Sequence, residues 1–191
     1  MKYYLSLFFV LSLTMMYPAQ ASNGYYPPGQ SIENPAKTIH DALKKLQAFG
    51  ANRDNAKPEL LRNFLETKII PHFAFDRMTD WVAGPYARRM SAANMRELEA
   101  NVKQAFLDSL SKHLGDYDTS GARVTIKPVQ YRGSGQAQVT ALIYSARPYP
   151  DRLDFRMQTQ GNGWKIVDVT ANGNSAALYY RRHFISTLRQ Y

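Results

Sequence analysis

The strongest constraint on this chain is a change of sequence pattern near Gly121. Before this residue, apolar side chains recur at the spacing of amphipathic helices, whereas the segments after it are rich in β-forming residues that alternate in polarity. The predicted strands are residues 123–129, 136–144, 152–159 and 164–170, and Gln160-Gly161-Asn162-Gly163 has the composition of a tight hairpin turn. This segregation predicts an α+β fold, in which a four-stranded antiparallel, curved sheet packs against several helices.

Caps and helix breakers set the predicted helix boundaries. Serine and aspartate, such as Ser91 and Asp76, can accept hydrogen bonds from the free N–H groups of a first turn, whereas glycine and proline end helices. The predicted helices lie between Asn34 and Gly50, Pro58 and Pro71, Asp76 and Gly84, Ser91 and Gly115, and Ser175 and Gln190. No linker or internal repeat interrupts these elements, so residues 34–191 are predicted to form a single domain.

The N-terminal residues predict export. An apolar stretch over residues 5–16 leads to Pro18-Ala19-Gln20-Ala21, which has the small-x-small pattern that signal peptidase requires. The stretch is shorter than the roughly 20 apolar residues that a transmembrane helix needs. We therefore predict a cleaved signal peptide at residues 1–21, followed by an extended arm at residues 22–33, where paired prolines and flanking glycines cannot sustain a helix.

Cysteine content and charge narrow the possible partners. The chain has no cysteine, which excludes disulfides, Cys-ligated zinc and thiol catalysis. Its formal net charge of +9 favours anionic surfaces. Because the chain is predicted to be exported, we expect transient contact with the anionic lipids of a membrane surface rather than with nucleic acid. A role of the charge in solubility alone is the alternative.

Residue patterns for catalysis and metal binding are scarce. The histidines, His40, His72, His113 and His183, are scattered over different predicted helices without the spacing of metal ligands, so neither a metal site nor a cofactor is predicted. No nucleotide-binding loop or nucleophile elbow occurs. We therefore predict no catalytic residues and no enzymatic activity. The alternative is an acid–base pair of His72 and Asp76, which helical spacing would place one turn apart.

Aromatic and flexible apolar side chains are abundant instead. They crowd the interval around the helix breaks at Pro71 and Gly84, and they alternate along the predicted strands. A curved sheet under helices can leave an apolar cavity, which is the usual form of a small-molecule pocket. We predict a lipid pocket lined by Phe75, Met78, Trp81, Val82, Val102, Phe106, Leu142, Tyr144, Phe155, Met157 and Trp164. Ordinary packed core is the alternative for each of these residues.

Two blocks of sequence carry a resemblance to one protein family. The first is Ile70-Pro71-His72-Phe73-Ala74-Phe75-Asp76-Arg77-Met78, followed by Gly84, Tyr86, Arg88-Arg89 and Ser91. The second is Gly163-Trp164-Lys165-Ile166-Val167-Asp168-Val169, followed by Gly173-Asn174-Ser175 and Tyr180-Arg181-Arg182-His183-Phe184. In order and spacing, the chain resembles the MlaC-type phospholipid-binding proteins, also called toluene-tolerance auxiliary-component proteins, over most of its length after residue 21. Asn174 departs from the pattern, because the family usually has an apolar residue there.

The resemblance implies a soluble carrier in the periplasm of a Gram-negative cell. Its cargo would be phospholipid, moved between an outer-membrane MlaA-type lipoprotein complex and an inner-membrane ABC transporter with MlaD-type domains, which maintains outer-membrane lipid asymmetry. A related branch is associated with hopanoid synthesis, so a polycyclic lipid is an alternative cargo. Arginines bind phosphates and carboxylates through bidentate hydrogen bonds. Contacts with the lipid head group or a partner are therefore predicted for Arg88, Arg89, Arg181 and Arg182; solvated surface arginines are the alternative.

Overall fold

The computed structural model describes residues 34–52, 57–115, 121–145 and 147–188. The signal peptide predicted at residues 1–21 and the arm predicted at residues 22–33 lie outside the described residues. The described elements follow the predicted order, because a largely helical part up to residue 115 precedes a sheet and a last helix. No helix among the described residues has both the length and the apolar character to cross a membrane.

The helices begin and end close to the predicted boundaries. The α-helices are α1 (Pro35–Gly50), α2 (Pro58–Phe64), α3 (Phe75–Ala83), α4 (Ala92–Gly115) and α5 (Ala176–Leu188). Between α2 and α3 the chain continues through a π-helical turn, η2 (Leu65–Ile69), and a 3-10 turn, η3 (Ile70–His72). A second 3-10 turn, η4 (Gly84–Arg89), joins α3 to α4. The helix predicted before Pro71 is therefore a helical stretch of changing pitch.

Side-chain caps explain two helix starts. The Asn34 side chain caps α1 and the Ser91 side chain caps α4, at the positions that the sequence predicts. The predicted cap at Asp76 is wrong, because α3 already begins at Phe75 and Asp76 lies within its first turn. The negative charge still favours this helix, since it lies near the positive end of the helix dipole.

All neighbouring strands of the sheet are antiparallel. The strands are β1 (Arg123–Ile126), β2 (Gln130–Tyr131), β3 (Gln136–Tyr144), β4 (Asp151–Gln160), β5 (Gly163–Ala171) and β6 (Asn174–Ser175). They follow the order β1-β3-β4-β5-β6, and β2 also pairs with β3. The predicted hairpin turn is confirmed, since Gln160 pairs with Gly163 and Gly161 has a φ of 59°.

The prediction of four strands is wrong, because the sheet has six. The strand predicted over residues 123–129 ends earlier, as β1 at Ile126, and a separate short strand, β2, follows the predicted segment; both pair with β3. Pro128 lies between them and has no N–H to donate to a strand ladder. The sixth strand, β6, is a two-residue return after the turn that follows β5.

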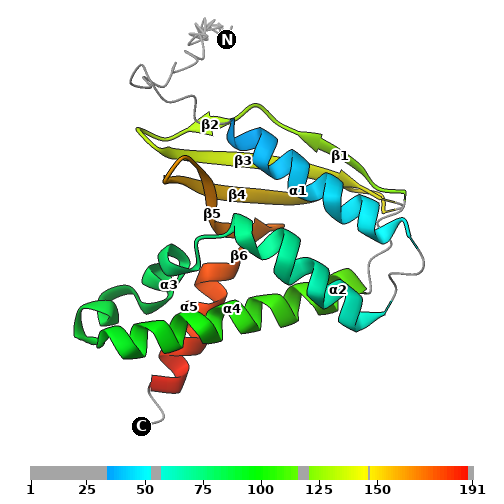
Figure 1. Ribbon diagram of the computed structural model, residues 1–191. Helices are drawn as coiled ribbons and strands as arrows, with labels where there is room; N and C mark the ends of the chain where they lie inside the picture. The colour runs from blue at the N-terminus through cyan, green and yellow to red at the C-terminus, as the bar shows by residue number, and fades with distance from the viewer. Residues whose placement is uncertain (1–33, 53–56, 116–120, 146, 189–191) are drawn as a thin grey trace, which may run out of the picture.

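Buried apolar side chains form two cores. Helix α1 lies across one face of the sheet, and α2 to α5 form a second group beside β5 and β6 (Figure 1). The α1–sheet core includes Ile39, Val139 and Met157, and the helical core includes Leu65 and Met78. The half-buried ring of Phe73, just after η3, packs against both cores. The two cores therefore meet near the end of η3.

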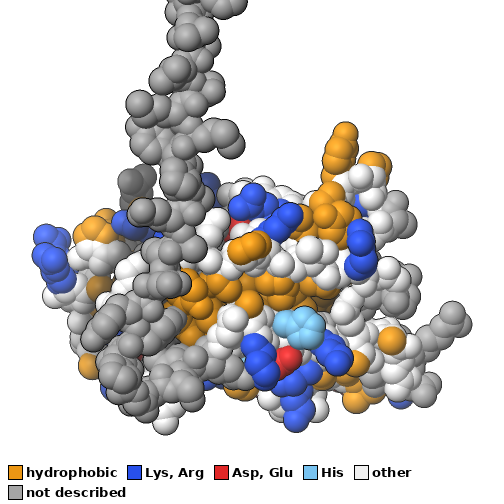
Figure 2. Space-filling view, turned by 90° about the horizontal axis from the view of Figure 1, so that it is seen from above, with side chains coloured by type: hydrophobic (Ala, Val, Ile, Leu, Met, Phe, Trp, Pro, Cys, Tyr) orange, Lys and Arg blue, Asp and Glu red, His pale blue; other side chains and the backbone are white. Residues whose placement is uncertain are grey.

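The α1–sheet core reaches the surface at the edge of the sheet. Val124 and Ile126 on β1, and Val129 just after it, are half-buried and pack against this core. On the face seen from above, hydrophobic side chains form a stripe bordered by Lys and Arg side chains (Figure 2). The edge of the sheet thus exposes apolar surface between charged groups.

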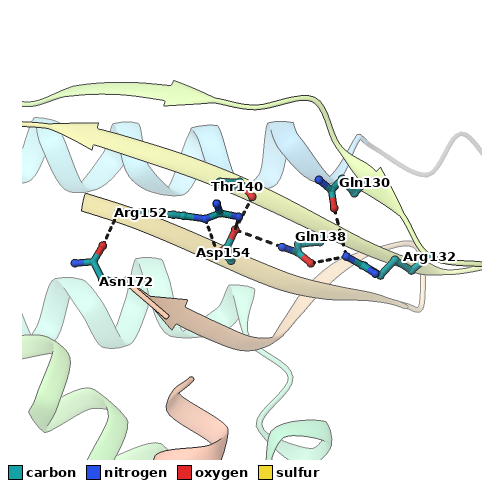
Figure 3. Close-up of polar contacts among 7 residues, drawn as sticks. All are labelled: Gln130, Arg132, Gln138, Thr140, Arg152, Asp154 and Asn172. Atoms are coloured by element: carbon teal, nitrogen blue, oxygen red, sulfur yellow. Dashed lines mark hydrogen bonds and ion pairs between the residues drawn. The ribbon is translucent and has the colours of Figure 1, made fainter. Parts of the chain in front are cut away.

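The opposite face of the sheet carries a polar network (Figure 3). The Asp154 carboxylate on β4 accepts hydrogen bonds from Arg152 Nε at 2.8 Å, from Gln138 Nε2 at 3.3 Å and from the Thr140 hydroxyl. Burial alone would raise the pKa of Asp154, but the hydrogen bonds from Arg152 and Thr140 outweigh it and hold this pKa below its usual value. Gln138 and Thr140 alternate along β3 with buried residues of the α1–sheet core, so the two faces of the sheet differ in chemistry.

Candidate binding cavity

A cavity of about 600 Å³ lies where the α1–sheet core meets the helical core. Its wall comes from the helical elements α1, η2, α4 and α5 and from the strands β1, β3, β4, β5 and β6. The buried part of the wall consists of Ile39, Ala42, Leu43, Ile69, Phe106, Phe155, Ile166 and Tyr180. Small-molecule sites typically enclose about 300–1,000 Å³ behind mostly apolar walls, so both the size and the lining fit an apolar ligand.

Helical and strand periodicity explain the wall. Helix α1 contributes Ile39, Leu43 and Leu46, which are spaced by four and three residues and so lie on one side of the helix. Strand β4 contributes Leu153 and Phe155, which are two residues apart and therefore point to the same face. The sheet and α1 thus turn regular apolar rows toward the same space.

No Asp, Glu, Lys or Arg is among the described residues that line the cavity. The polar wall residues are amides, hydroxyls and two histidines: Gln47, His72, Ser109, His113, Asn174, Ser175, Tyr179 and Tyr180. Several of these groups are already paired: Gln47 Nε2 donates to the Ala122 carbonyl at 2.6 Å, His113 Nδ1 donates to the Ser109 carbonyl at 2.7 Å, and the Ser175 hydroxyl donates to the Asp168 carboxylate at 2.8 Å. Burial raises the pKa of Tyr180 to about 12, so its hydroxyl stays neutral. The wall offers apolar contact and little electrostatic attraction for a free ion.

Five wall residues are exposed and mark the mouth of the cavity. Ser109 and His113 lie on α4, Ala171 and Asn174 flank the turn between β5 and β6, and Tyr179 lies on α5. The remaining wall residues are buried or half-buried. The mouth therefore lies between the C-terminal half of α4, the β5–β6 turn and the first turns of α5. In Figure 1, β6 leads directly into α5, which crosses α4.

A buried carboxylate fixes the start of α5. Asp168 on β5 is 2% exposed and accepts hydrogen bonds from the Ser175 hydroxyl at 2.8 Å and the Ala177 backbone N–H at 3.0 Å. Ser175 Oγ in turn accepts a hydrogen bond from the Leu178 backbone N–H at 3.1 Å and so caps the helix. These bonds join β5 to α5 and hold the helical turn that carries Tyr179 at the mouth.

Two of the predicted pocket residues, Phe106 and Phe155, lie on the cavity wall. The buried residues among the others lie inside the two cores. Phe75, Met78, Val82 and Val102 belong to the helical core, and Met157 and Trp164 belong to the α1–sheet core. Their predicted contact with lipid stays a prediction, but the described cavity does not reach them.

The last three predicted pocket residues lie on outer surfaces. Leu142 and Tyr144 share a face, as their alternation predicts, but it is the polar face of the sheet. The Arg123 guanidinium lies 4.6 Å from the centre of the Tyr144 ring. Trp81 is 40% exposed, and the Arg156 guanidinium lies 4.3 Å from the centre of its ring.

The sequence interpretation missed the contributions of α1 and of Ile143. The apolar row of α1 was visible as helical periodicity, but periodicity indicates a buried side and does not distinguish a cavity wall from packed core. Ile143 lines the cavity and is adjacent in sequence to Leu142, which does not. A shift of one residue along a strand exchanges its two faces, so Leu142 and Ile143 point to opposite sides of the sheet and only Ile143 meets the cavity.

None of the four predicted contact arginines lines the cavity. Arg88 and Arg89 are exposed on η4, and Arg182 is exposed on α5. Arg181 is half-buried and packs over Gly84, where an added Cβ would lie 2.8 Å from Arg181 Nη2. The close contact of Arg181 with Gly84 joins α5 to η4, so these residues lie on neighbouring elements. Their predicted contacts with a head group or a partner stay predictions.

The two residues of the acid–base alternative lie in different surroundings. His72 lines the cavity, whereas Asp76 does not. The Asp76 carboxylate accepts a hydrogen bond from Gln160 Nε2 at 3.3 Å and lies 3.9 Å from Arg77 Nε. Within the described ranges, no group of three or more His, Asp or Glu side chains is placed to hold a metal ion.

Comparisons with known proteins agree with this architecture. The sequence profile of the MlaC protein family matches residues 37–191. No curated protein matches the chain. Among solved structures, the phospholipid-binding protein from Ralstonia solanacearum, in complex with a phospholipid, is similar at a TM-score of 0.73 and 18% sequence identity, covering 83% of this chain and 89% of that chain. At this identity the likeness supports the fold alone. Because the profile match spans most of the sequence, this chain belongs to the MlaC protein family.

Proposed function

We propose that the protein binds a phospholipid and holds its acyl chains in the cavity. The observation that carries this proposal is the wall, which encloses about 600 Å³ with an apolar buried lining and no Asp, Glu, Lys or Arg among the described lining residues. The phospholipid-binding protein from Ralstonia solanacearum, which shares the fold, supports it. The proposal includes no chemical step, in agreement with the absence of a recognisable catalytic pattern in the sequence.

The cavity wall suits an apolar occupant. Water that enters through the mouth finds few partners deeper inside, because ordered water needs two or more polar groups and the buried part of the wall is almost entirely apolar. An acyl chain suits this wall better, since each methylene that it buries contributes about 0.8 kcal/mol.

We further propose that the bound lipid is in transit. A bilayer buries acyl chains about as well as an apolar cavity does, so the transfer of a lipid between the two is nearly balanced in free energy. A carrier needs this balance, because much tighter binding would prevent release and much weaker binding would prevent uptake. Contact with a donor or acceptor can then set the direction of transfer.

The proposed route joins the two membranes of a Gram-negative envelope. In it, the protein moves phospholipid through the periplasm between an outer-membrane MlaA-type lipoprotein complex and an inner-membrane ABC transporter with MlaD-type domains. This route would maintain outer-membrane lipid asymmetry. Membership of the MlaC family and the export pattern at residues 1–21 support the proposal. Its test is the transfer of fluorescent phospholipid from the loaded protein to purified MlaD-type domains, and no transfer would contradict it.

A pair of tryptophan substitutions tests the cavity itself. Ile143 and Leu142 are adjacent on β3 and both half-buried, but only Ile143 lines the cavity. The indole ring of Ile143→Trp should displace two or three methylenes of the lipid, which at about 0.8 kcal/mol each weakens binding by about 2 kcal/mol, or roughly 30-fold. Leu142→Trp places the same ring on the polar face and serves as the matched control.

The readout is the affinity of each purified variant for a fluorescent phospholipid, with circular dichroism to verify folding. We expect Leu142→Trp to bind within about twofold of the unmodified protein, because it leaves the wall unchanged. Equal weakening by both substitutions, or weakening by Leu142→Trp alone, would contradict the assignment of the cavity as the lipid site.

A further inference from the structure

One side of α5 next to the mouth carries an unusual combination of exposed residues. Leu178 and Tyr179 are 53% and 60% exposed, and within the described ranges no other large hydrophobic residues are both exposed and consecutive. One turn further along α5, Arg182 and His183 are also exposed. Residues three or four positions apart lie on the same side of a helix, so Arg182 lies beside Leu178 and Tyr179, and His183 lies beside Tyr179. We call these four residues, Leu178, Tyr179, Arg182 and His183, the mouth face.

The apolar half of the mouth face is not needed to pack α5. The helix contacts the helical core through Ala177 and Tyr180, which are 1% and 9% exposed. Leu178 and Tyr179 leave more than half of their surface in solvent, and the Tyr179 ring contacts the Tyr180 ring edge-on, with centroids 5.3 Å apart. Tyrosine has an apolar ring and a polar hydroxyl, and this combination favours the boundary between lipid and water.

The charges on this side of α5 are of one sign. Helix α5 contains Arg181, Arg182 and His183 but no aspartate or glutamate. A cationic group close to an exposed apolar pair complements the anionic head groups of a membrane surface, and each such group adds to the attraction.

The mouth face is continuous with the cavity. Tyr179 belongs to both, since it lines the cavity and lies on the exposed side of α5. Asp168 and Ser175 hold the start of α5, so the position of Tyr179 relative to the mouth is fixed by the fold. A flat surface that contacts Leu178 and Tyr179 must therefore lie next to the mouth.

We infer that the mouth face docks on an anionic lipid surface while the protein takes up or delivers its cargo. In this position an acyl chain passes between the bilayer and the cavity without crossing water, where each exposed methylene is unfavourable. The inference rests on the proposed function and adds to it the surface through which lipid is exchanged. It assigns Leu178 and Tyr179 to the apolar contact and Arg182 to the head groups.

The test measures vesicle binding and lipid uptake with Leu178→Asp and a matched control. Leu60→Asp is the control, because Leu60 is an exposed leucine on α2, 40% exposed, that does not line the cavity. Sedimentation with vesicles of phosphatidylglycerol and phosphatidylethanolamine reports docking, and vesicles of phosphatidylcholine alone report the dependence on anionic lipid. Loading from detergent micelles reports the cavity without any bilayer.

We expect Leu178→Asp to bind the anionic vesicles at least about tenfold more weakly, because a carboxylate replaces an apolar contact and repels anionic head groups. It should also extract phospholipid from them correspondingly more slowly, while its micelle loading stays normal. Leu60→Asp should match the unmodified protein in all three measurements. Arg182→Glu, which keeps the apolar pair, should weaken binding to anionic vesicles only.

Two results would overturn the inference and leave the proposed function standing. One is normal vesicle extraction by Leu178→Asp together with normal transfer to purified MlaD-type domains, which would leave the mouth face without a docking role. The other is normal vesicle extraction together with lost transfer to these domains, which would make the mouth face a protein-docking surface. If the unmodified protein took up no phospholipid even from micelles, the proposed function itself would fail.

Discussion

Replacing Asp168 with alanine should loosen α5 from the sheet and lower stability by about 3 kcal/mol. The buried Ala177 N–H would lose its acceptor, and an unpaired buried donor costs about 1–3 kcal/mol. The Ser175 hydroxyl would lose a bond to a charged group, a further 1.5 kcal/mol or so. Removing a buried carboxylate offsets part of this loss, since its desolvation is relieved.

Thermal unfolding followed by circular dichroism measures the effect. A loss of about 3 kcal/mol corresponds to a decrease in Tm of about 6–12 °C in a domain of this size. Asp168→Asn keeps one carbonyl oxygen as an acceptor, so its free energy of unfolding should fall by about half as much as that of Asp168→Ala. The control is Asp80→Ala, because the Asp80 side chain is 53% exposed and its ion pair with Arg77 is long, at 3.9 Å. An Asp168→Ala protein with a Tm within about 2 °C of the unmodified protein would refute the reasoning.

Three further predictions concern stability and docking. Gly84→Ala should lower the free energy of unfolding, measured in urea, by about 1–3 kcal/mol, because Gly84 has φ 55° and ψ −129° and the new Cβ would displace Arg181. Gly133→Ala is the control: Gly133 has φ 73° but lies in open space, so this substitution should lower the free energy of unfolding by less. The pKa of Asp154 is lowered in the folded state, so the ionised carboxylate stabilises the fold. This stabilisation is fully present above about pH 4 and is lost as the pH falls further. The stability difference between the unmodified protein and Asp154→Asn should therefore shrink below that pH, and a constant difference would contradict this. Replacing both Arg88 and Arg89 with glutamate should slow transfer to MlaD-type domains and leave lipid content unchanged; unaltered transfer would remove their docking role.

The sequence predicts much of the fold because strong local signals agree with the final packing. Asn34 and Ser91 cap helices where the sequence indicates, and the Gly161 turn joins β4 to β5. The strand count fails near Pro128, because β1 ends before this residue, which has no N–H to donate, and the two-residue strand β2 begins after it. It also fails at β6, which is too short to show any period.

The cavity is less predictable than the fold, because burial and cavity lining have the same sequence signature. Val82 and Phe155 are both buried apolar residues, yet only Phe155 meets the cavity. The difference depends on where the packing between the helical core and the α1–sheet core leaves a cavity, and the tertiary arrangement of the helices and the sheet determines this place. Val82 is 0% exposed within the helical core, so a charged residue at this position should unfold the protein rather than empty the cavity.

Asp168 shows what the family pattern adds. The resemblance draws attention to the block that ends in Asp168-Val169, but not to the reason for the aspartate. The structure supplies a physical reason, because its carboxylate joins β5 to the first turn of α5. Asn174, which departs from the pattern, lies at the mouth of the cavity, where it exposes a polar amide.

The most direct test of the account is to purify the protein without detergent and to identify extracted lipid by mass spectrometry. The account predicts phospholipid at a fixed molar ratio of about one, since one cavity of this size holds one ligand. Hopanoid at that ratio would keep the cavity as the binding site and change the cargo. A folded, monodisperse protein that carries no lipid, and acquires none from liposomes, would contradict the account.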